Sequence, residues 1–396
     1  MKKKSPETTK HNLNHKVKPI SLFLFIFSVI LICLFFVFNG PRKVRTLITL
    51  TYFVKSALAS QNYQEKNFKN IPQPTTIEYP DGNSQTKAWI FKPNKTVSHS
   101  AIIISFGVGI NDENKNLLIQ TADNLRKSGI TVLVPLPEDV QKDDITLRAI
   151  ESYKNAFTFL EKQSYIDPKK IGFLGFCAGS DLLLVAATNN EISNKILFVA
   201  SFSAYADIND FYSEVFSHHT IGSNSHLWIP NQISYNLALK GFSRGLLTKI
   251  KVENDIDKKF LDDILINGKL DRSKITGLSP QWQEIMTIIT SRDPYFIRSQ
   301  FPKFPAELLK LNDDISPINH VKNIKAPIFL IHDRNDDFEP VEESKRLADA
   351  FGPQAQFLET NILDHTILRN KIPIQSWLKE GPKIFSFLYK IFSKTS

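Results

Sequence analysis

The sequence predicts an α/β fold with a mostly parallel sheet, an inserted helical lid and one N-terminal transmembrane helix. Strand-like and helix-like segments alternate over residues 71–206 and again over residues 315–396. Between these two parts, residues 207–314 contain polar, aromatic and helix-like pieces in place of apolar strands. An uncharged apolar run lies between Lys18 and Arg42. Because strands separated by helices need right-handed crossovers, the alternation predicts parallel strands.

The apolar run is long enough to cross a bilayer, since roughly 20 helical residues span a hydrocarbon core of about 30 Å. We assign residues 1–18 to a basic tail, 19–41 to a transmembrane anchor and 42–70 to a connector. A cleaved signal peptide is the alternative, but its apolar core is usually shorter and no small-residue cleavage site follows directly. Six lysines precede the run and three basic residues follow it. We expect a single-pass membrane protein with a cytoplasmic N-terminus.

The charge distribution argues against nucleic-acid binding. Of the formal net charge of +9, the first 45 residues carry +8, which leaves a nearly neutral body without a basic stripe. The two cysteines, Cys33 in the apolar run and Cys177 in the body, provide no disulfide framework. Cysteine usage therefore does not indicate the redox compartment.

The first part of the predicted core, residues 71–206, contains five strand signals before its cysteine motif and one after it. The strands are TTIEY, KAWIFK, AIIIS, ITVLVP, Lys170–Phe176 and ILFVAS, and the helices are Asn116–Lys127, Thr146–Lys162 and one that begins at Ala178. The stretch TLITLTYFVKSALAS before this core could form a helix on the membrane surface or against the body.

The lid, residues 207–314, contains helix-like pieces such as FLDDILING, WQEIMTIIT and PAELLKL. The second part of the core, residues 315–396, returns to alternation. Its elements are the strand APIFLIHD, a helix over Val341–Phe351, the strand QFLETN and a closing amphipathic helix over Ile374–Ile391.

The segment Gly175-Phe176-Cys177-Ala178-Gly179 stands between a buried strand and a helix. In a turn of this kind the middle residue is strained, its side chain projects from the sheet edge, and the glycines relieve the clash between strand and helix. A thiol at a helix N-terminus should have a lowered pKa, and the Ala178 N–H could stabilise an oxyanion. Cys177 is therefore a candidate nucleophile, although an isolated cysteine is often only a small buried side chain.

A nucleophile also needs a base and a residue that orients the base. Asp336 follows the apolar strand IFLIHD, and His365 lies in the loop after the last strand. The order nucleophile, acid, histidine fits a triad in which His365 is the base and Asp336 fixes its tautomer. Asp337 competes with Asp336 for this role, and Asp364, next to His365, is a further alternative.

These motifs resemble the α/β-hydrolases, and the cysteine at the elbow is similar to the dienelactone hydrolase branch. The stretches YIDPKKIGFLG and SPINHVKNIKAPIFLIHDRNDDFEP also look like the family's approaches to nucleophile and acid. The resemblance covers roughly residues 75–392 and implies Cys177 as nucleophile, Asp336 as acid and His365 as base. It further implies a second oxyanion donor from Gly107 or Val108, beside Ala178.

The sequence indicates neither a metal nor a cofactor. His218, His219 and His226 match no metal-ligand spacing, and SFGVGIN lacks the spacing of a dinucleotide loop. His332 is expected to be a structural polar residue.

We therefore expect a membrane-anchored hydrolase of esters, thioesters or lactones, acting on a small-molecule or lipid-derived acyl substrate. Two alternatives stay open. One is an acyltransferase of the same fold that resembles polyhydroxyalkanoate synthases, and the other is a degenerate binding module.

Overall fold

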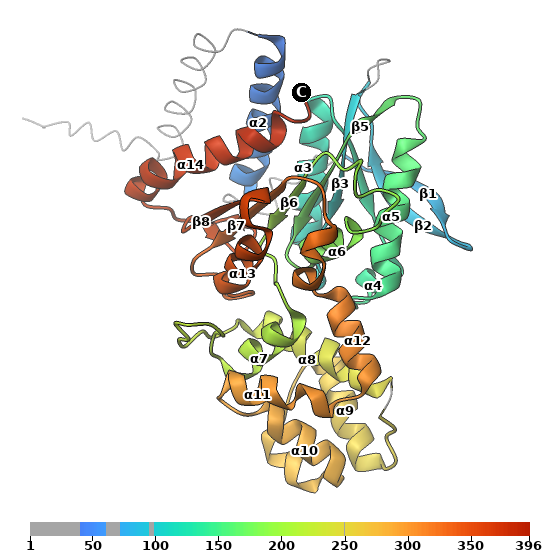
Figure 1. Ribbon diagram of the computed structural model, residues 1–396, viewed down its shortest axis with the longest axis vertical. Coiled ribbons are helices and arrows are strands. Elements are labelled where there is room, and N and C mark those ends of the chain that lie inside the picture. Colours follow the sequence, from blue (N-terminus) through green and yellow to red (C-terminus); the bar gives the residue numbers. More distant parts are fainter. Residues whose placement is uncertain (1–39, 61–71, 95–98, 249) are drawn as a thin grey trace, which may run out of the picture.

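The computed structural model describes residues 40–60, 72–94, 99–248 and 250–396 (Figure 1). Within them, one eight-stranded sheet has the order β1-β2-β4-β3-β5-β6-β7-β8. Strands β1 and β2, and β2 and β4, pair antiparallel, and all pairs from β3 to β8 are parallel. The prediction of a mostly parallel α/β sheet is confirmed. The strands are β1 (Thr75–Asp81), β2 (Ser84–Phe91), β3 (His99–Ser105), β4 (Thr131–Pro135), β5 (Ile166–Phe176), β6 (Val199–Phe202), β7 (Ile328–Asp333) and β8 (Ala355–Thr360).

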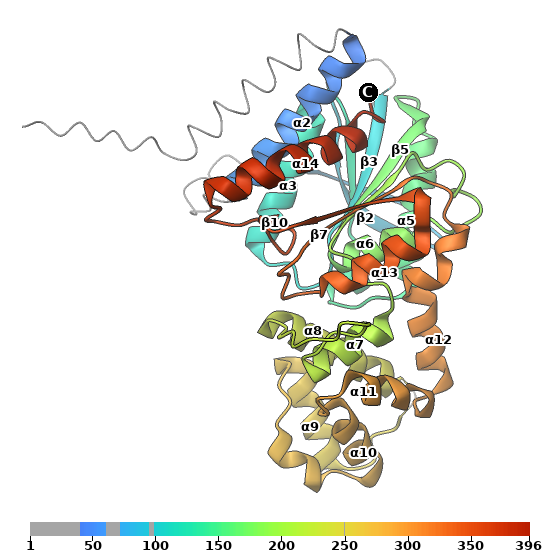
Figure 2. The same cartoon turned by 60° about the vertical axis from the view of Figure 1, so that its left-hand side comes forward.

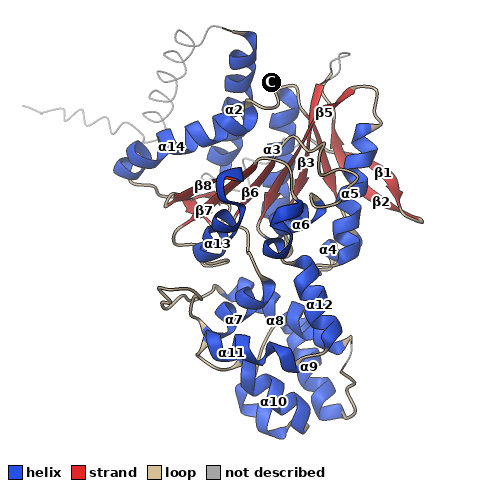
Figure 3. Cartoon of the chain, in the orientation of Figure 1, coloured by secondary structure: helices blue, strands red, loops and turns tan. Residues whose placement is uncertain are grey.

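Helices cover both faces of this sheet (Figure 3). One face packs against α5 (Leu147–Glu161), α6 (Ala178–Ala186) and α13 (Val341–Phe351), and the other against α2 (Pro41–Ser60), α3 (Asp112–Lys127) and α14 (Ile374–Phe392). The alternation of side chains along β3 explains the two cores, since Ile103 belongs to the first and Ile102 and Ile104 to the second. Every residue of β3 is buried, as expected for a central parallel strand.

A helical unit is inserted between β6 and β7 and lies at one end of the sheet (Figure 2). It spans the residues of the predicted lid. Its core is aromatic, with Phe242 in edge-to-face contact with Phe301 and Phe304 at centroid distances of 6.1 and 5.4 Å. Its helices are α7 (Ile208–Ser217), α8 (Gln232–Leu247), α9 (Asp255–Asn267), α10 (Pro280–Ile289), α11 (Pro294–Gln300) and α12 (Ala306–Ile315).

Short elements complete the described fold. They are the helix α4 (Glu138–Gln141), the hairpin β9 (Leu363–Asp364) and β10 (Ile367–Leu368), and the 3₁₀ turns η2 (Arg272–Gly277), η3 (Phe301–Lys303), η4 (Pro317–Asn323) and η5 (Gly352–Gln354). The hairpin is absent from the sequence prediction, which placed only a loop after the last strand.

The predicted tail and nearly all of the predicted anchor lie outside the described residues. Among the helices that the structure describes, none combines the length and apolarity needed to cross a membrane. Helix α2, within the predicted connector, packs against the body: Asn124 in α3 donates to Ser56 Oγ at 2.7 Å, and Thr46 Oγ1 lies 2.8 Å from Ser396 Oγ. Of the two placements considered for this segment, the structure therefore has the helix against the body.

Candidate active site

Cys177 occupies the turn between β5 and α6 in a rare backbone conformation. Its φ of 53° and ψ of −143° lie where a side chain with a Cβ is strained. The turn is held on both sides, because the Cys177 N–H donates to the Phe202 carbonyl at 2.8 Å and the Ser180 N–H donates to the Cys177 carbonyl at 2.7 Å. Such strain in a well-held turn is the arrangement predicted for a projecting nucleophile.

The two glycines of the motif are required by close packing. A Cβ on Gly175 would lie 2.8 Å from the Ser180 nitrogen, and one on Gly179 would lie 2.6 Å from the carbonyl carbon of Phe106. Both contacts are with backbone, which cannot turn aside as a side chain can. The glycines thus allow α6 to begin directly against β5 and the loop after β3.

The thiol of Cys177 faces a buried carboxyl group that the sequence analysis did not assign. Its Sγ donates to Glu339 Oε1 at 3.5 Å. Burial and the neighbouring Glu339 raise the pKa of the thiol well above its usual value, although the Ala178 N–H acts in the opposite direction. The expectation of a lowered thiol pKa is therefore wrong for this arrangement, because desolvation and a nearby acid outweigh the helix N-terminus.

Asp336 and His365 are joined as the triad order predicts. His365 Nδ1 lies 2.8 Å from Asp336 Oδ2, which also accepts a hydrogen bond from Ser203 Oγ at 2.8 Å. Burial favours the neutral acid, yet the charge of His365 and hydrogen bonds from His332 and His365 hold the pKa of Asp336 well below its usual range. An ionised Asp336 is suited to fix the tautomer and orientation of His365.

The alternative acids lie elsewhere. Asp337 is exposed and accepts a hydrogen bond from Asn231 Nδ2 at 3.0 Å, while Asp364 is exposed in the short hairpin. His365 itself has a φ of 54°, which the turn of the hairpin imposes.

His332 is a further member of this network. Its Nδ1 lies 2.7 Å from Ser344 Oγ, and its Nε2 lies 2.9 Å from the Glu339 carbonyl and 3.3 Å from Asp336 Oδ2. Although burial opposes protonation, the hydrogen bond and charge of Asp336 raise the pKa of His332. The side chain thus supports the loop that carries both Asp336 and Glu339, as a structural polar residue would.

No hydrogen bond joins His365 to Cys177 among the described residues. Instead the ring of Phe338 stacks on the His365 imidazole, with 4.5 Å between ring centroids and 16° between planes. The structure therefore brings acid and histidine together, and directs the thiol toward Glu339. For His365 to take the thiol proton, the S–H bond of Cys177 must point away from Glu339 and toward the imidazole.

The loop after β3 lies directly against the elbow. A Cβ on Gly107 would be 3.0 Å from the Ala178 nitrogen and 3.2 Å from Cys177 Sγ, so the Gly107 backbone borders the thiol. The loop is anchored by Asp143, whose Oδ1 accepts the Gly109 N–H at 2.7 Å. Gly107 and Ala178 are thus adjacent beside the Cys177 thiol.

A cavity of about 220 Å³ opens between the elbow and the helical unit. Val108, Cys177 and Ala178 contribute to its wall from the core. Phe211, Tyr212, Leu237 and Ala238 contribute apolar surface from α7 and α8. Arg244 also lines it and ties α8 to the core, since its Nη1 donates to the Asp143 carbonyl at 2.6 Å.

Within the described residues, His, Cys, Asp and Glu side chains form no group of three that could hold a metal ion. Of the lid histidines, His226 Nδ1 lies 3.1 Å from Thr220 Oγ1, and the His218 ring packs edge-on against Tyr235.

No family model matches this sequence, and no curated protein matches it. Solved structures of similar shape include the acylaminoacyl peptidase of Pyrococcus horikoshii, with 13% identity, a TM-score of 0.46 and coverage of 84% of this chain. Another is an α/β hydrolase from a Penicillium species, with 15% identity and a TM-score of 0.46, where the match covers 82% of this chain and 98% of that chain. A third is 2,6-dihydroxy-pseudo-oxynicotine hydrolase, with 12% identity and a TM-score of 0.47, where the match covers 88% of this chain and 87% of that chain.

The chain spans only 43% of the length of the Pyrococcus peptidase. These similarities concern shape alone, so the function is argued from the side chains.

Proposed function

We propose that the protein hydrolyses carboxylic esters, thioesters or lactones through an acyl-enzyme on Cys177, with His365 as base and Asp336 as its orienting acid. The backbone conformation of Cys177, at the strand-to-helix turn and beneath an open cavity, is the observation that carries this proposal. The 2.8 Å contact between Asp336 Oδ2 and His365 Nδ1 supports it. We further propose that residues 19–41 anchor this enzyme in a membrane.

The reaction begins when the thiol turns from Glu339 toward His365 and transfers its proton to the imidazole. The sulfur then forms a bond to the substrate carbonyl carbon, whose π electrons move to oxygen. The Ala178 N–H and one from Gly107 or Val108 stabilise this oxyanion. As the carbonyl re-forms, the bond to the leaving group breaks, and the leaving oxygen or sulfur takes the proton from His365.

Water completes the cycle. His365 accepts a proton from a water molecule, whose oxygen attacks the thioester carbonyl of the acyl-enzyme. Collapse of this second tetrahedral intermediate breaks the carbon–sulfur bond, releases the carboxylic acid and returns a proton to the thiolate. Asp336 stays ionised throughout and stabilises the imidazolium that forms twice in each cycle.

The cavity favours a small or medium-sized acyl substrate. Its volume of about 220 Å³ lies just below the range usual for ligand sites, and its lid-side wall is mainly aromatic and aliphatic. The charged side chains that line it among the described residues are Asp143, Asp144, Arg244 and Glu339. We propose a small-molecule or lipid-derived acyl group as the substrate.

Hydrolysis of short and long p-nitrophenyl esters and acyl thioesters by the full chain tests the proposal. We expect Cys177→Ala to abolish turnover, while Cys33→Ala, which removes the other cysteine, retains it. Transfer of the acyl group to an acceptor other than water would indicate an acyltransferase. A folded protein that neither turns over nor forms an acyl adduct would indicate a binding module.

A further inference from the structure

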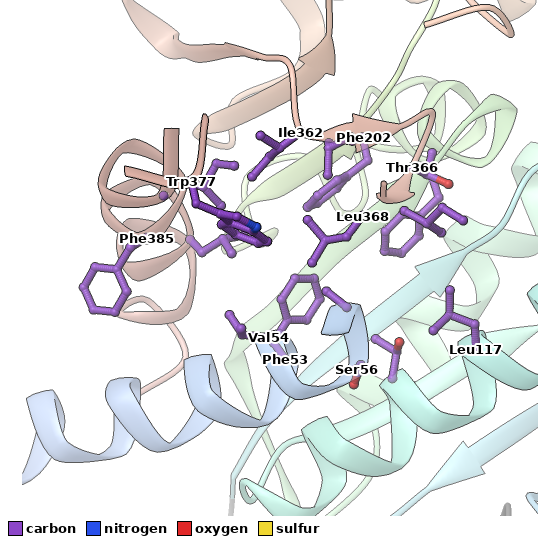
Figure 4. A pocket seen from close by; sticks show the side chains of 18 of the residues that line it. Phe53, Val54, Ser56, Leu117, Phe202, Ile362, Thr366, Leu368, Trp377 and Phe385 are labelled. Atoms are coloured by element: carbon purple, nitrogen blue, oxygen red, sulfur yellow. The ribbon is translucent and has the colours of Figure 1, made fainter. Parts of the chain in front are cut away.

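A second cavity, of about 320 Å³, lies between α2, α3, α14 and the β9–β10 hairpin (Figure 4). Among the residues that the structure describes, none lines both cavities. Phe106, Phe176 and Phe202 form the wall that faces the sheet ends, and their rings pack in series at centroid distances of 4.8 and 5.0 Å. This cavity is therefore a separate space behind the catalytic loops.

The wall of the second cavity offers almost no polar group to a ligand. None of the side chains that line it in the described chain is charged. Hydroxyl groups come from Ser56, Thr121 and Thr366, and that of Ser56 is already engaged, since it donates to the Tyr52 carbonyl at 3.2 Å and accepts from Asn124. A cavity of this composition selects hydrocarbon and excludes charged or strongly polar groups.

The cavity reaches the surface beside α14. Ile374 and Leu378, which line it, are 44% and 59% exposed and lie one helical turn apart, so they form an apolar rim. Exposed Lys371 and Lys379 are close to this rim in sequence. On the opposite wall, α2 starts at Pro41, the last residue of the predicted membrane segment.

We propose that this cavity binds the hydrocarbon chain of one fatty acid, with the carboxylate at the rim near Lys371 and Lys379. A cavity of about 150 Å³ holds one benzene, so by simple scaling the present volume holds a chain of about twelve carbons. The proposal does not depend on the hydrolase activity, because Cys177 belongs to the other cavity.

The test uses the full chain and a twelve-carbon fatty acid that carries a photoreactive diazirine at its methyl end. After irradiation, mass spectrometry should place the label on peptides that line the cavity, from α2, α3, α14, the hairpin or the wall of Phe106, Phe176 and Phe202. Cys177→Ala should label equally well. Val54→Trp, which fills the cavity from α2, should reduce this labelling at least tenfold. Ile48→Trp is the matched control, since Ile48 is 44% exposed on the same helix and lies outside the wall.

Label on other segments, or labelling unchanged by Val54→Trp, would overturn the proposal. Competition by unlabelled acids on the unsubstituted chain provides a second measurement that does not depend on a variant folding. Their affinity should rise about fourfold per methylene up to about twelve carbons and then level off. A chain-length dependence that is flat throughout, or stronger competition by two-chain phosphatidylcholine than by the fatty acid, would also contradict it.

Discussion

Replacing Glu339 by Gln should make the Cys177 thiol more reactive. The thiol donates to Glu339 Oε1 at 3.5 Å, and the carboxylate is, after burial, the main cause of the raised pKa of Cys177. Glutamine keeps the size and an acceptor oxygen at this position, and removes the ionisable group. The pKa of Cys177 should therefore fall, while the part of the increase that comes from burial remains.

The magnitude follows from the separation of the two groups. Two full charges about 4 Å apart interact by about 4 kcal/mol at an effective dielectric constant near 20, which is an upper limit here. Burial and the charge of Asp336 also raise the pKa of Glu339, so the thiol and the carboxyl compete for protons and only part of this energy is recovered. We expect alkylation of the thiol near pH 9 to become about tenfold to a few hundredfold faster, since each 1.4 kcal/mol is about a factor of ten.

The assay measures the rate of iodoacetamide alkylation as a function of pH in a Cys33→Ala background, so that Cys177 is the single thiol. Asp337→Asn is the matched control, because it removes an exposed carboxylate from the same loop, and its profile should match that of the parent. A Glu339→Gln profile that is unchanged, or shifted to higher pH, would refute the assignment of Glu339 as the group that suppresses the thiolate.

Three further predictions concern the elbow and the acid. Gly175→Ala should lower the free energy of unfolding by at least about 2 kcal/mol, because its Cβ would overlap the Ser180 backbone; Gly277→Ala, which meets open space, should change the melting temperature little. Asp336→Asn should lower kcat by about 10²–10⁴ with ester substrates, whereas Asp337→Asn should stay near wild type, and equal losses would contradict the choice of acid. Because the pKa of Asp336 is lowered in the folded state, its ionised form stabilises the fold above about pH 4, and this contribution is lost as the pH falls. In denaturant titrations, the free energy of unfolding should therefore decrease less with falling pH for Asp336→Asn than for the wild type.

The order of elements could be predicted because the core strands carry unambiguous patterns. Continuous apolar runs such as Ala101–Ser105 and Ile328–Asp333 form buried parallel strands, with helices of regular period between them. The helices of the lid are harder to predict from sequence, because α7, α8 and α11 mix polar and aromatic residues. Their apolar faces become evident only when they pack around Phe242. The membrane anchor stays a prediction, since it lies almost entirely outside the described residues.

Two parts of the candidate site could be predicted from sequence: the order of nucleophile, acid and histidine along the chain, and the glycine-framed turn around Cys177. Glycines around Cys177 and an acid after an apolar strand are local signals, and Asp336 does contact His365. The role of Glu339 has no such signal, because it is one of three acids in the same loop and only the fold turns it toward the thiol. The raised pKa of Cys177 depends on this burial and was for the same reason not predictable.

The second cavity is also a property of tertiary structure. Its walls come from α2 and α14, which lie at opposite ends of the described sequence and meet only in the folded chain. Their apolar residues, such as Phe53 and Trp377, are indistinguishable in sequence from ordinary core residues.

Trapping of the acyl-enzyme tests the central claim most directly. The full chain is mixed with an acyl thioester or p-nitrophenyl ester, quenched in acid at short times, and analysed by intact mass and peptide mapping. We predict one acyl group on Cys177, formed in a burst with release of the leaving group, decaying with turnover, absent from Cys177→Ala and strongly reduced in His365→Ala. Turnover of the same substrate by Cys177→Ala at the wild-type rate, or an acyl group on any other residue, would contradict the assignment of Cys177 as the nucleophile.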